Sequence, residues 1–411
     1  MTRERPTHIP MTQFPAVDGV LQVGGVPLTT LATRVGGTPF YAYDRQLISH
    51  RIAELRAQLP EAIELHYAMK ANPMPAVVHH LAGLVDGIDV ASAGELQVAL
   101  DTGTPPSEIS FAGPGKRDGE LAQALTTGIT INLESFGEME RLARLGEQHG
   151  HRPRVAVRVN PDFELKASGM KMGGGPKVFG VDAELVPDML GRIRELDLAF
   201  QGFHIFTGSQ NLRAESLFEA HDKTFDLAYR LAEEAREPLT FLNIGGGLGI
   251  PYFPGDQPID LAAVGEHLHD HVETAHRRLG KTKLVMELGR YMVGEAGVYV
   301  ARVIDRKVSR GHTYLITDGG LHHHLAASGN FGQVIRKNYP VAIGNRMDVP
   351  PEENATVTGP LCTPLDMLAD RMDLPRADVG DLVVVFQSGA YGLTASPLGF
   401  LSHPGPEEVL V

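Results

Sequence analysis

Lys70 ends a strand-like run of the chain, in the segment HYAMKANP (66–73), immediately before an Asn-Pro turn. Most lysines at such places are solvated and have no chemical role. An amine that can lose its proton, however, is able to attack a carbonyl group and form a Schiff base. Lys70 is therefore a candidate nucleophile, provided that the rest of the chain supplies the other groups that this chemistry needs.

A glycine-rich turn and a carboxylate supply two such groups. The three consecutive glycines of NIGGGLG (243–249) let backbone N–H groups approach an anion such as a phosphate, although a plain tight turn also favours glycine. Glu287, in MELGRY (286–291), can either hold a pyridine nitrogen protonated or form a rim salt bridge with Arg290. An amine, a phosphate site and a carboxylate together indicate pyridoxal 5'-phosphate as the cofactor.

Eight strand-like runs alternate with helix-like segments and must position these residues. The runs cover 62–69, 87–92, 108–113, 129–134, 154–161, 200–206, 239–247 and 283–289. Between them, apolar residues recur every three or four positions, as on one face of a helix. Strands that alternate with helices form parallel sheets, so eight such units predict an α/β fold with a closed (β/α)8 barrel of the TIM type.

From about residue 290 the alternation gives way to strands joined by Gly/Pro turns. These runs cover 297–308, 312–320, 355–362 and 381–392. They predict a C-terminal β domain, a sandwich or a small barrel, which FYAYD (40–44) is expected to join. The predicted parts are a disordered tail at 1–14, a cofactor-binding barrel at 38–288 and a β domain from 15–37 and 289–411.

Composition restricts the classes of partner and compartment. Cys362 is the only cysteine, which excludes an intramolecular disulfide. The sequence contains no apolar run of about 20 residues, so no membrane span is predicted. The N-terminal segment lacks the apolar core of a secretory leader, so secretion is not expected. The cytoplasm is therefore the expected location. The net charge of −13 argues against broad nucleic-acid binding, which needs a basic surface.

The distinctive residues gather at one end of the proposed strands. At or just beyond the carboxyl ends of the strands lie Lys70, Asp89, Arg158, His204 to Gln210, Gly245 to Gly249 and Glu287 to Arg290. That rim carries the active site in barrel enzymes. We therefore predict that Lys70 lies in an active site.

At this point the chain resembles the fold-type III pyridoxal-phosphate decarboxylases of diaminopimelate, ornithine and arginine. The resemblance covers about residues 35 to 405 and implies an alanine racemase-like barrel. Its motifs are YAMKANP, DVASAGEL (89–96), RVNP (158–161), GSQ (208–210), NIGGGLG, ELGR (287–290), GPLCTPLD (359–366) and SGAYG (388–392).

The resemblance implies a role for each matching residue. Lys70 would bind the cofactor aldehyde, and Glu287 would face the pyridinium nitrogen. Cys362 would reach across a homodimer interface and protonate the substrate carbon after carbon dioxide leaves. The remaining cofactor-binding residues would be Asp89, Arg158, His204, Phe206, Ser209, Gly245, Gly246, Gly247, Arg290 and Tyr391.

Two positions depart from the family pattern. Decarboxylases of basic amino acids carry Asp or Glu after the cysteine, to pair with the distal amine of the substrate, whereas this chain has Thr363. A hydroxyl cannot neutralise a buried ammonium, so the substrate is expected to lack a distal cation. In HIFTGSQ (204–210), Phe206 occupies the place of the histidine that usually stacks on the cofactor. His204 is expected to be its neighbour or polar support.

Both departures point to one subgroup of the family. In these features the chain resembles the butirosin-type decarboxylases, which act on aminoacyl groups carried by an acyl carrier protein in secondary-metabolite and antibiotic biosynthesis. The motifs SGMKMGGGPKVFG (168–180), DGGLHHH (318–324), RKNYP (336–340) and SGAYGLTASPLGFLSHP (388–404) carry this resemblance. The α-amine and α-carboxylate of the substrate must be free, so a carrier has to hold the amino acid through its side-chain carboxyl. Glutamyl, aspartyl and methylaspartyl groups all satisfy this requirement.

Other residues are weaker candidates for substrate binding. Arg336, near Tyr339, is placed either to grip a carboxylate or the carrier's arm, or to be a solvated loop arginine. Thr363 and His322 are expected to line the site. Neighbouring residues of a strand point to opposite faces, so the triple histidine 322–324 is not predicted to bind a metal. The glycines of 166–180 permit a flap over the site.

The sequence thus predicts a decarboxylase that depends on pyridoxal phosphate, acts on a carrier-bound acidic amino acid and forms a homodimer with shared sites. One alternative is decarboxylation of a free amino acid such as diaminopimelate. A second alternative is an amino-acid racemase of the same fold, but the resemblance implies that such a racemase has arginine at the position of Glu287. A third is a non-catalytic homologue, which would be expected to lack Lys70 or Cys362.

Overall fold

The computed structural model describes residues 6–165, 170–171 and 173–411, and the chain divides into two compact units. One unit comprises Arg51–Ile250 and Pro258–Tyr291. The other comprises the described residues up to His50, with Pro251–Gln257 and Met292–Val411. The predicted flap at 166–180 falls partly outside the described residues, at 166–169 and 172.

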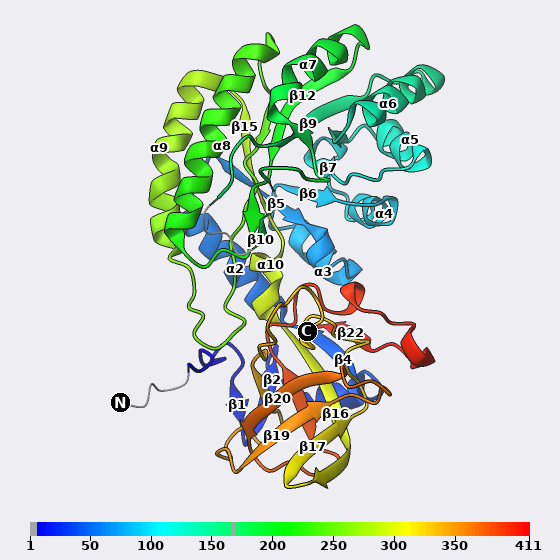
Figure 1. Ribbon diagram of the computed structural model, residues 1–411, viewed down its shortest axis with the longest axis vertical. Coiled ribbons are helices and arrows are strands. Elements are labelled where there is room, and N and C mark those ends of the chain that lie inside the picture. The colour runs from blue at the N-terminus through cyan, green and yellow to red at the C-terminus, as the bar shows by residue number, and fades with distance from the viewer. Residues whose placement is uncertain (1–5, 166–169, 172) are drawn as a thin grey trace. The chain divides into compact units, whose positions relative to one another are not determined.

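A closed ring of eight parallel strands forms the first unit (Figure 1). Around the ring, the strands are β5 (Ile63–Ala68), β6 (Gly87–Val90), β7 (Ile109–Phe111), β8 (Thr130–Leu133), β9 (Arg154–Asn160), β12 (Ala199–Ile205), β14 (Phe241–Asn243) and β15 (Lys283–Leu288). The ring closes because β15 pairs with β5, and the short strand β11 (Val181–Asp182) adds to β9. Each of the eight predicted strand runs is confirmed, as is the (β/α)8 barrel.

Helices connect these strands, and Figure 1 shows α4–α9 on the outside of the barrel. The connecting helices are α3 (Pro75–Ala82), α4 (Ala93–Asp101), α5 (Asp118–Thr127), α6 (Phe136–His149), α7 (Val186–Glu195), α8 (Ala214–Ala235) and α9 (Leu261–Leu279). Helix α2 (Arg45–Gln58) precedes β5, and α10 (Arg290–Val293) follows β15. In α6, Met139 and Leu142 are buried, and the Ser135 hydroxyl caps the helix by accepting a hydrogen bond from the Glu138 N–H. Among the described helices, none is long and apolar enough to cross a membrane.

The long strand β16 (Gly297–Ser309) organises the sheet of the second unit. The other strands of this sheet are β4 (Phe40–Tyr43), β17 (His312–Thr317), β18 (Val341–Ile343), β19 (Glu353–Thr358), β20 (Met367–Leu374), β21 (Leu382–Val385) and β22 (Glu407–Leu410). Strand β4 lies antiparallel to β16, with Tyr41 opposite Tyr299, and parallel to β22. The prediction that FYAYD joins the C-terminal β domain is therefore confirmed.

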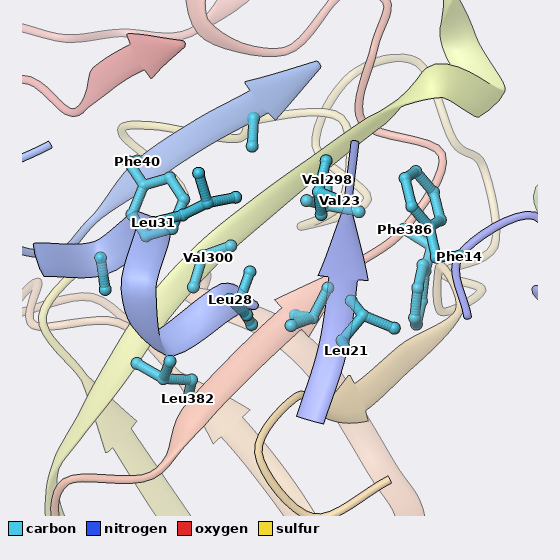
Figure 2. Close-up of a cluster of buried hydrophobic side chains, with 13 residues drawn as sticks. Phe14, Leu21, Val23, Leu28, Leu31, Phe40, Val298, Val300, Leu382 and Phe386 are labelled. Atoms are coloured by element: carbon cyan, nitrogen blue, oxygen red, sulfur yellow. The ribbon is translucent and has the colours of Figure 1, made fainter. Parts of the chain in front are cut away.

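The same unit contains a hydrophobic core that Figure 2 shows at close range. Side chains from β2 (Val20–Val23) and α1 (Leu28–Arg34) meet those of β4, β16 and β21 there. Short strands β1 (Ala16–Val17) and β3 (Val26–Pro27) pair with β2 on either side. Phe14, which the sequence placed at the end of a tail, is buried and lies 5.9 Å from the ring centroid of Phe386.

Candidate active site

Lys70 and Glu287 meet at the carboxyl end of the barrel, on neighbouring strands. Lys70 lies in the short 3-10 turn η1 (Met69–Ala71) after β5, and Glu287 lies near the end of β15. The Lys70 Nζ is 3.3 Å from the Glu287 Oε1. The lysine side chain is 45% exposed, whereas that of the glutamate is 5% exposed. A solvent-accessible amine therefore contacts a buried carboxylate.

The surroundings of Glu287 keep its carboxyl ionised. Burial, the largest single influence, would raise the pKa of this group, but Lys70, His204 and Arg158 together outweigh it. The pKa of Glu287 consequently lies well below its usual range. The His204 Nε2 is 3.0 Å from the Glu287 Oε2. A carboxylate held in this way can bind a cationic ring N–H.

His204 and Phe206 occupy the places that the alternation of β12 predicts. Both lie beside the Lys70–Glu287 pair, with their ring centroids 6.5 Å apart and their planes at 72°. The Lys70 Nζ is 5.8 Å from the centroid of the Phe206 ring. His204 thus lies against the carboxylate, while Phe206 presents an aromatic ring near the amine. The stacking of Phe206 on a cofactor remains a prediction.

The glycine loop after β14 runs directly against β15. Gly245 and Gly247 have φ values of +72° and +89°, which favour glycine, and a Cβ on Gly246 would overlap the Glu287 carbonyl oxygen. The Gly245 N–H donates to the Asn243 Oδ1 at 2.8 Å. A side chain at any of these positions would strain the loop or fill the space beside Glu287. The loop thus fits a backbone cradle for an anion.

Ser209 is brought to the same loop. It lies in β13 (Gly208–Ser209), and the N–H of Asn211 donates to the Gly247 carbonyl at 2.9 Å. Arg290 begins α10, three residues after Glu287, and is half-buried. The glycine loop thus lies between the end of β15, where the Glu287 N–H donates to the Gly245 carbonyl, and the segment that follows Ser209. The binding of phosphate by the glycine loop, Ser209 and Arg290 remains a prediction.

Asp89 and Arg158 lie on β6 and β9 and are already engaged with other side chains. The Asp89 Oδ1 accepts a hydrogen bond from the Ser110 hydroxyl at 2.5 Å and lies 3.3 Å from the His66 Nδ1. Arg158 donates to the Glu134 Oε1 at 2.8 Å. Both predicted residues are buried among polar partners on the barrel strands.

Glu134 is a site residue that the sequence reading missed. Besides Arg158, it accepts hydrogen bonds from the N–H groups of Gly113 at 2.6 Å and Gly180 at 3.1 Å. Burial would raise the pKa of this carboxyl, but Arg158 and Lys116 lower it. Glu134 thus orients Arg158 and ties two rim loops together. The available signal was a carboxylate at the carboxyl end of a barrel strand, a position that Glu287 also occupies.

The predicted catalytic cysteine belongs to the second unit. Cys362 is exposed, and it lies in the turn between β19 and β20. Thr363 is half-buried, and its hydroxyl accepts a hydrogen bond from the Leu365 N–H at 3.3 Å. Asp366 is buried behind them and accepts from the N–H groups of Leu361 at 2.8 Å and Leu321 at 2.6 Å. This carboxylate, another residue that the sequence reading missed, fixes the cysteine turn.

We expect Asp366→Ala to destabilise the second unit by roughly 2–4 kcal/mol, because two buried N–H groups lose their acceptor. Asp366→Asn keeps one acceptor oxygen and should cost about half as much. Urea unfolding followed by circular dichroism measures both effects. An alanine variant with the wild-type midpoint would show that the carboxylate does not stabilise the turn.

The weaker substrate candidates lie in buried polar or aromatic surroundings of the second unit. The Arg336 guanidinium donates to the carbonyls of Ser328 at 2.8 Å and Met367 at 2.6 Å, so it is neither solvated nor wholly available to a carboxylate. Tyr339 packs against Tyr252, with centroids 4.7 Å apart. Tyr391 is half-buried with φ at +52°. Their binding roles remain predictions.

The triple histidine does not lie on a strand, so the strand-face argument used for it was wrong. His322 to His324 lie in turns beyond the end of β17. Burial lowers the pKa of His322 and His323 to about 4 and that of His324 to about 3. His324 Nε2 is 2.9 Å from the Ser388 hydroxyl, and the His322 ring is 3.7 Å from that of His323. These neutral rings belong to the buried interior of the unit.

Comparisons with known proteins agree with this geometry. The family model for the pyridoxal-binding domain of pyridoxal-dependent decarboxylases matches residues 45–294. The chain is 39% identical to the L-glutamyl-[BtrI acyl-carrier protein] decarboxylase of Niallia circulans, covering 93% of this chain and 90% of that protein. It is 33% identical to the diaminopimelate decarboxylase of Aquifex aeolicus, covering 96% and 91%.

A solved structure is similar to the chain over most of its length. The diaminopimelate decarboxylase of Helicobacter pylori, crystallised with L-lysine, superposes with a TM-score of 0.80 at 26% identity, covering 93% of this chain and 94% of that one. The likeness therefore extends over both units.

Proposed function

The chain belongs to the pyridoxal-dependent decarboxylases, and we propose that it removes the α-carboxylate of an acidic amino acid joined through its side chain to an acyl carrier protein. The amino acid is a glutamyl, aspartyl or methylaspartyl group. Its side-chain carboxyl forms the thioester, which leaves the α-amine and α-carboxylate free.

Thr363 is the observation that carries the choice of substrate. The position after Cys362 holds a half-buried hydroxyl, where the family resemblance implies a carboxylate in decarboxylases of basic amino acids. A distal ammonium at this place would lose its water without gaining a counter-charge. A thioester is uncharged and meets no such cost. The 39% identity to a decarboxylase of a carrier-bound glutamyl group supports the same choice.

The residues of the barrel fit pyridoxal phosphate. Lys70 offers the amine, Glu287 the counter-charge for the ring nitrogen, and the glycine loop the N–H groups for the phosphate. Ser209, Arg290 and Tyr391 complete this set in our proposal. When bound, the cofactor accepts the electron pair that carbon dioxide leaves behind.

The chain's own groups then have separate tasks. The Glu287 carboxylate keeps a proton on the ring nitrogen, and His204 holds that carboxylate in place at 3.0 Å. Phe206 excludes water from one side of the site. A thiol proton from Cys362 of the partner subunit is transferred to the α-carbon, which forms a C–H bond and leaves a thiolate. This division requires a homodimer in which each site draws residues from both chains.

The decisive experiment offers the enzyme acyl carrier proteins loaded through the side-chain carboxyl with glutamate, aspartate or methylaspartate. We expect intact mass spectrometry to show the loss of one carbon dioxide from at least one of these carriers. A carrier loaded through the α-carboxyl is the matched control, and it should not react because the group to be lost is blocked. Free glutamate and free diaminopimelate are tested alongside.

Turnover of free diaminopimelate alone would overturn the carrier-bound substrate and leave the decarboxylase chemistry intact. That alternative corresponds to the relatives that are diaminopimelate decarboxylases, at 33% identity. Exchange of the α-proton without release of carbon dioxide would instead indicate a racemase. The assay therefore separates the substrate from the reaction type.

A further inference from the structure

Three side chains on the outside of the barrel converge at one point, away from the residues described above. Asp222 lies on α8, and His267 and His271 lie one turn apart on α9. Residues four apart share a face of a helix, so both imidazoles point to the same neighbour. Figure 1 shows α8 and α9 side by side along their length. We propose that these three residues bind one Zn²⁺ ion.

The distances match the spacing of zinc ligands. The Nε2 atoms of His267 and His271 are 3.3 Å apart, and the Asp222 Oδ1 is 3.0 Å from the first and 2.8 Å from the second. Tetrahedral bonds of about 2.0–2.1 Å place neighbouring ligand atoms about 3.3 Å apart. The two nitrogens already have this separation. The carboxylate needs to withdraw by only a few tenths of an ångström, which its exposed side chain permits.

Stacking holds both imidazole rings in the required orientation. Phe218 of α8 lies against His267, with centroids 4.4 Å apart and planes at 24°. Phe225, two turns further along α8, lies against His271 at 4.6 Å and 6°. Each ring therefore turns its Nε2 towards Asp222 before any ion arrives. Such preorganisation lowers the entropic cost of binding.

Hydrogen bonding alone is a less complete account of this cluster. Without an ion, the two Nε2 atoms face each other at 3.3 Å while both also face the same Asp222 oxygen, so the available hydrogens cannot give every one of these three contacts its own donor. A divalent cation replaces both protons and uses a lone pair from each nitrogen. His221, the buried neighbour of Asp222, stacks parallel to His267 at 6.1 Å and is too far away to be a ligand.

The ligand set and its exposure favour zinc over a hard cation. Two imidazoles and one carboxylate suit Zn²⁺ and its transition-metal neighbours, whereas Mg²⁺ and Ca²⁺ prefer oxygen ligands. The side chains of Asp222, His271 and His267 are 55%, 19% and 24% exposed, so water can complete the coordination. The other cluster of this kind within the described residues, Glu64 with His66 and Glu108, already has the Lys283 ammonium 2.9 Å from Glu108.

A bound ion would join α8 to α9. The first of these helices follows the Ser209 loop, and the second lies between the glycine loop and the strand that carries Glu287. Because the ion binds only when the two helices are in register, it should stabilise the barrel by mass action. The proposal concerns this stabilising site and is independent of the substrate.

The test measures zinc binding to the chelator-treated holoenzyme by isothermal titration calorimetry, with Cys362→Ser as the background so that the exposed thiol does not compete. We expect one ion per chain and a zinc-dependent rise in the melting temperature. His271→Ala and Asp222→Asn should weaken binding at least tenfold and abolish that rise. His269→Ala and His276→Ala, which alter exposed histidines of the same helix, should change neither.

Cobalt provides a second readout that a purely structural role would not affect. Co²⁺ bound to His267 and His271 should give the intense visible absorption of a tetrahedral site, and Asp222→Asn should weaken it. Asp222 is exposed, so its amide variant is expected to fold. Unchanged zinc affinity in the His267→Ala/His271→Ala double variant, or no saturable uptake by the unsubstituted histidine cluster, would overturn the proposal.

Discussion

Lys70→Arg is expected to lower the rate of decarboxylation by roughly 10³-fold or more. Arginine keeps a positive charge beside Glu287, where the Lys70 Nζ lies 3.3 Å from the carboxylate. A guanidinium, however, is not deprotonated in proteins and cannot serve as a nucleophile. The fold and the counter-charge should survive while the chemistry is lost. The rate is measured as release of carbon dioxide at saturating cofactor.

Lys70→Ala is the matched variant, because it removes the charge as well as the amine. Both variants should be inactive, but only the alanine variant should lose the ion pair with Glu287 and its contribution to thermal stability. If the Lys70→Arg variant kept an activity within a factor of ten of wild type, the Lys70 amine would not be the reacting group. Such a result would also remove the basis for the cofactor site around β15.

Mixing the Lys70→Ala variant with a Cys362→Ala variant tests whether the active sites are shared between chains. Cys362→Ala should also be nearly inactive, since the proton donor is missing. If each site combines Lys70 of one chain with Cys362 of the partner subunit, mixed dimers contain one intact site. Random exchange of chains should then restore about a quarter of the wild-type activity. Absence of any recovery after verified exchange would place both residues in the same chain's site.

The strands could be predicted because a parallel barrel imposes a simple pattern on the sequence. Runs such as 154–161 are buried along nearly their whole length, and their closely spaced apolar residues, Val155 to Val157 and Val159, indicate a strand. The same pattern places Lys70 and Glu287 at one rim. Their direct contact follows from closure of the ring, in which β15 pairs with β5, and no local pattern encodes that pairing. The family resemblance supplied it instead.

Side chains whose hydrogen-bond partners depend on how the loops fold could not be predicted in this way. Glu134 accepts hydrogen bonds from the N–H groups of Gly113 and Gly180, which lie in two other loops. Asp366 accepts from the N–H of Leu361 in its own turn and from that of the distant Leu321. Partners that are distant in sequence are known only once the turns are placed. The triple histidine was misread as part of a strand, although Asp318-Gly319-Gly320 precedes it and favours a turn there. The pair His267 and His271 is visible as a helical spacing, but Asp222 is separated from it by more than 40 residues.

The second large effect concerns the buried carboxylate. Glu287→Gln is expected to lower kcat by roughly 10²- to 10³-fold, the usual cost of removing one preorganised charge from an active site. Glutamine is neutral, and its amide cannot hold a proton on a ring nitrogen. It also leaves the Lys70 ammonium and His204 without the carboxylate that now lies 3.3 Å and 3.0 Å from them. Glu287→Asp retains the charge with a shorter reach and should fall between the two.

The pH dependence distinguishes this role from a proton-transfer role. Although burial opposes ionisation, Lys70, His204 and Arg158 lower the pKa of Glu287 well below its usual range, so the carboxylate stays charged from about pH 5 to 9. The ratio of the wild-type to the Glu287→Gln rate should therefore be constant across this interval. A group with a depressed pKa contributes its stabilisation above its unfolded pKa of about 4.3 and loses it as the pH falls towards its folded value. A rate ratio that changed near neutral pH would mean that Glu287 itself exchanges a proton during turnover, and its assignment as a fixed counter-charge would then be wrong.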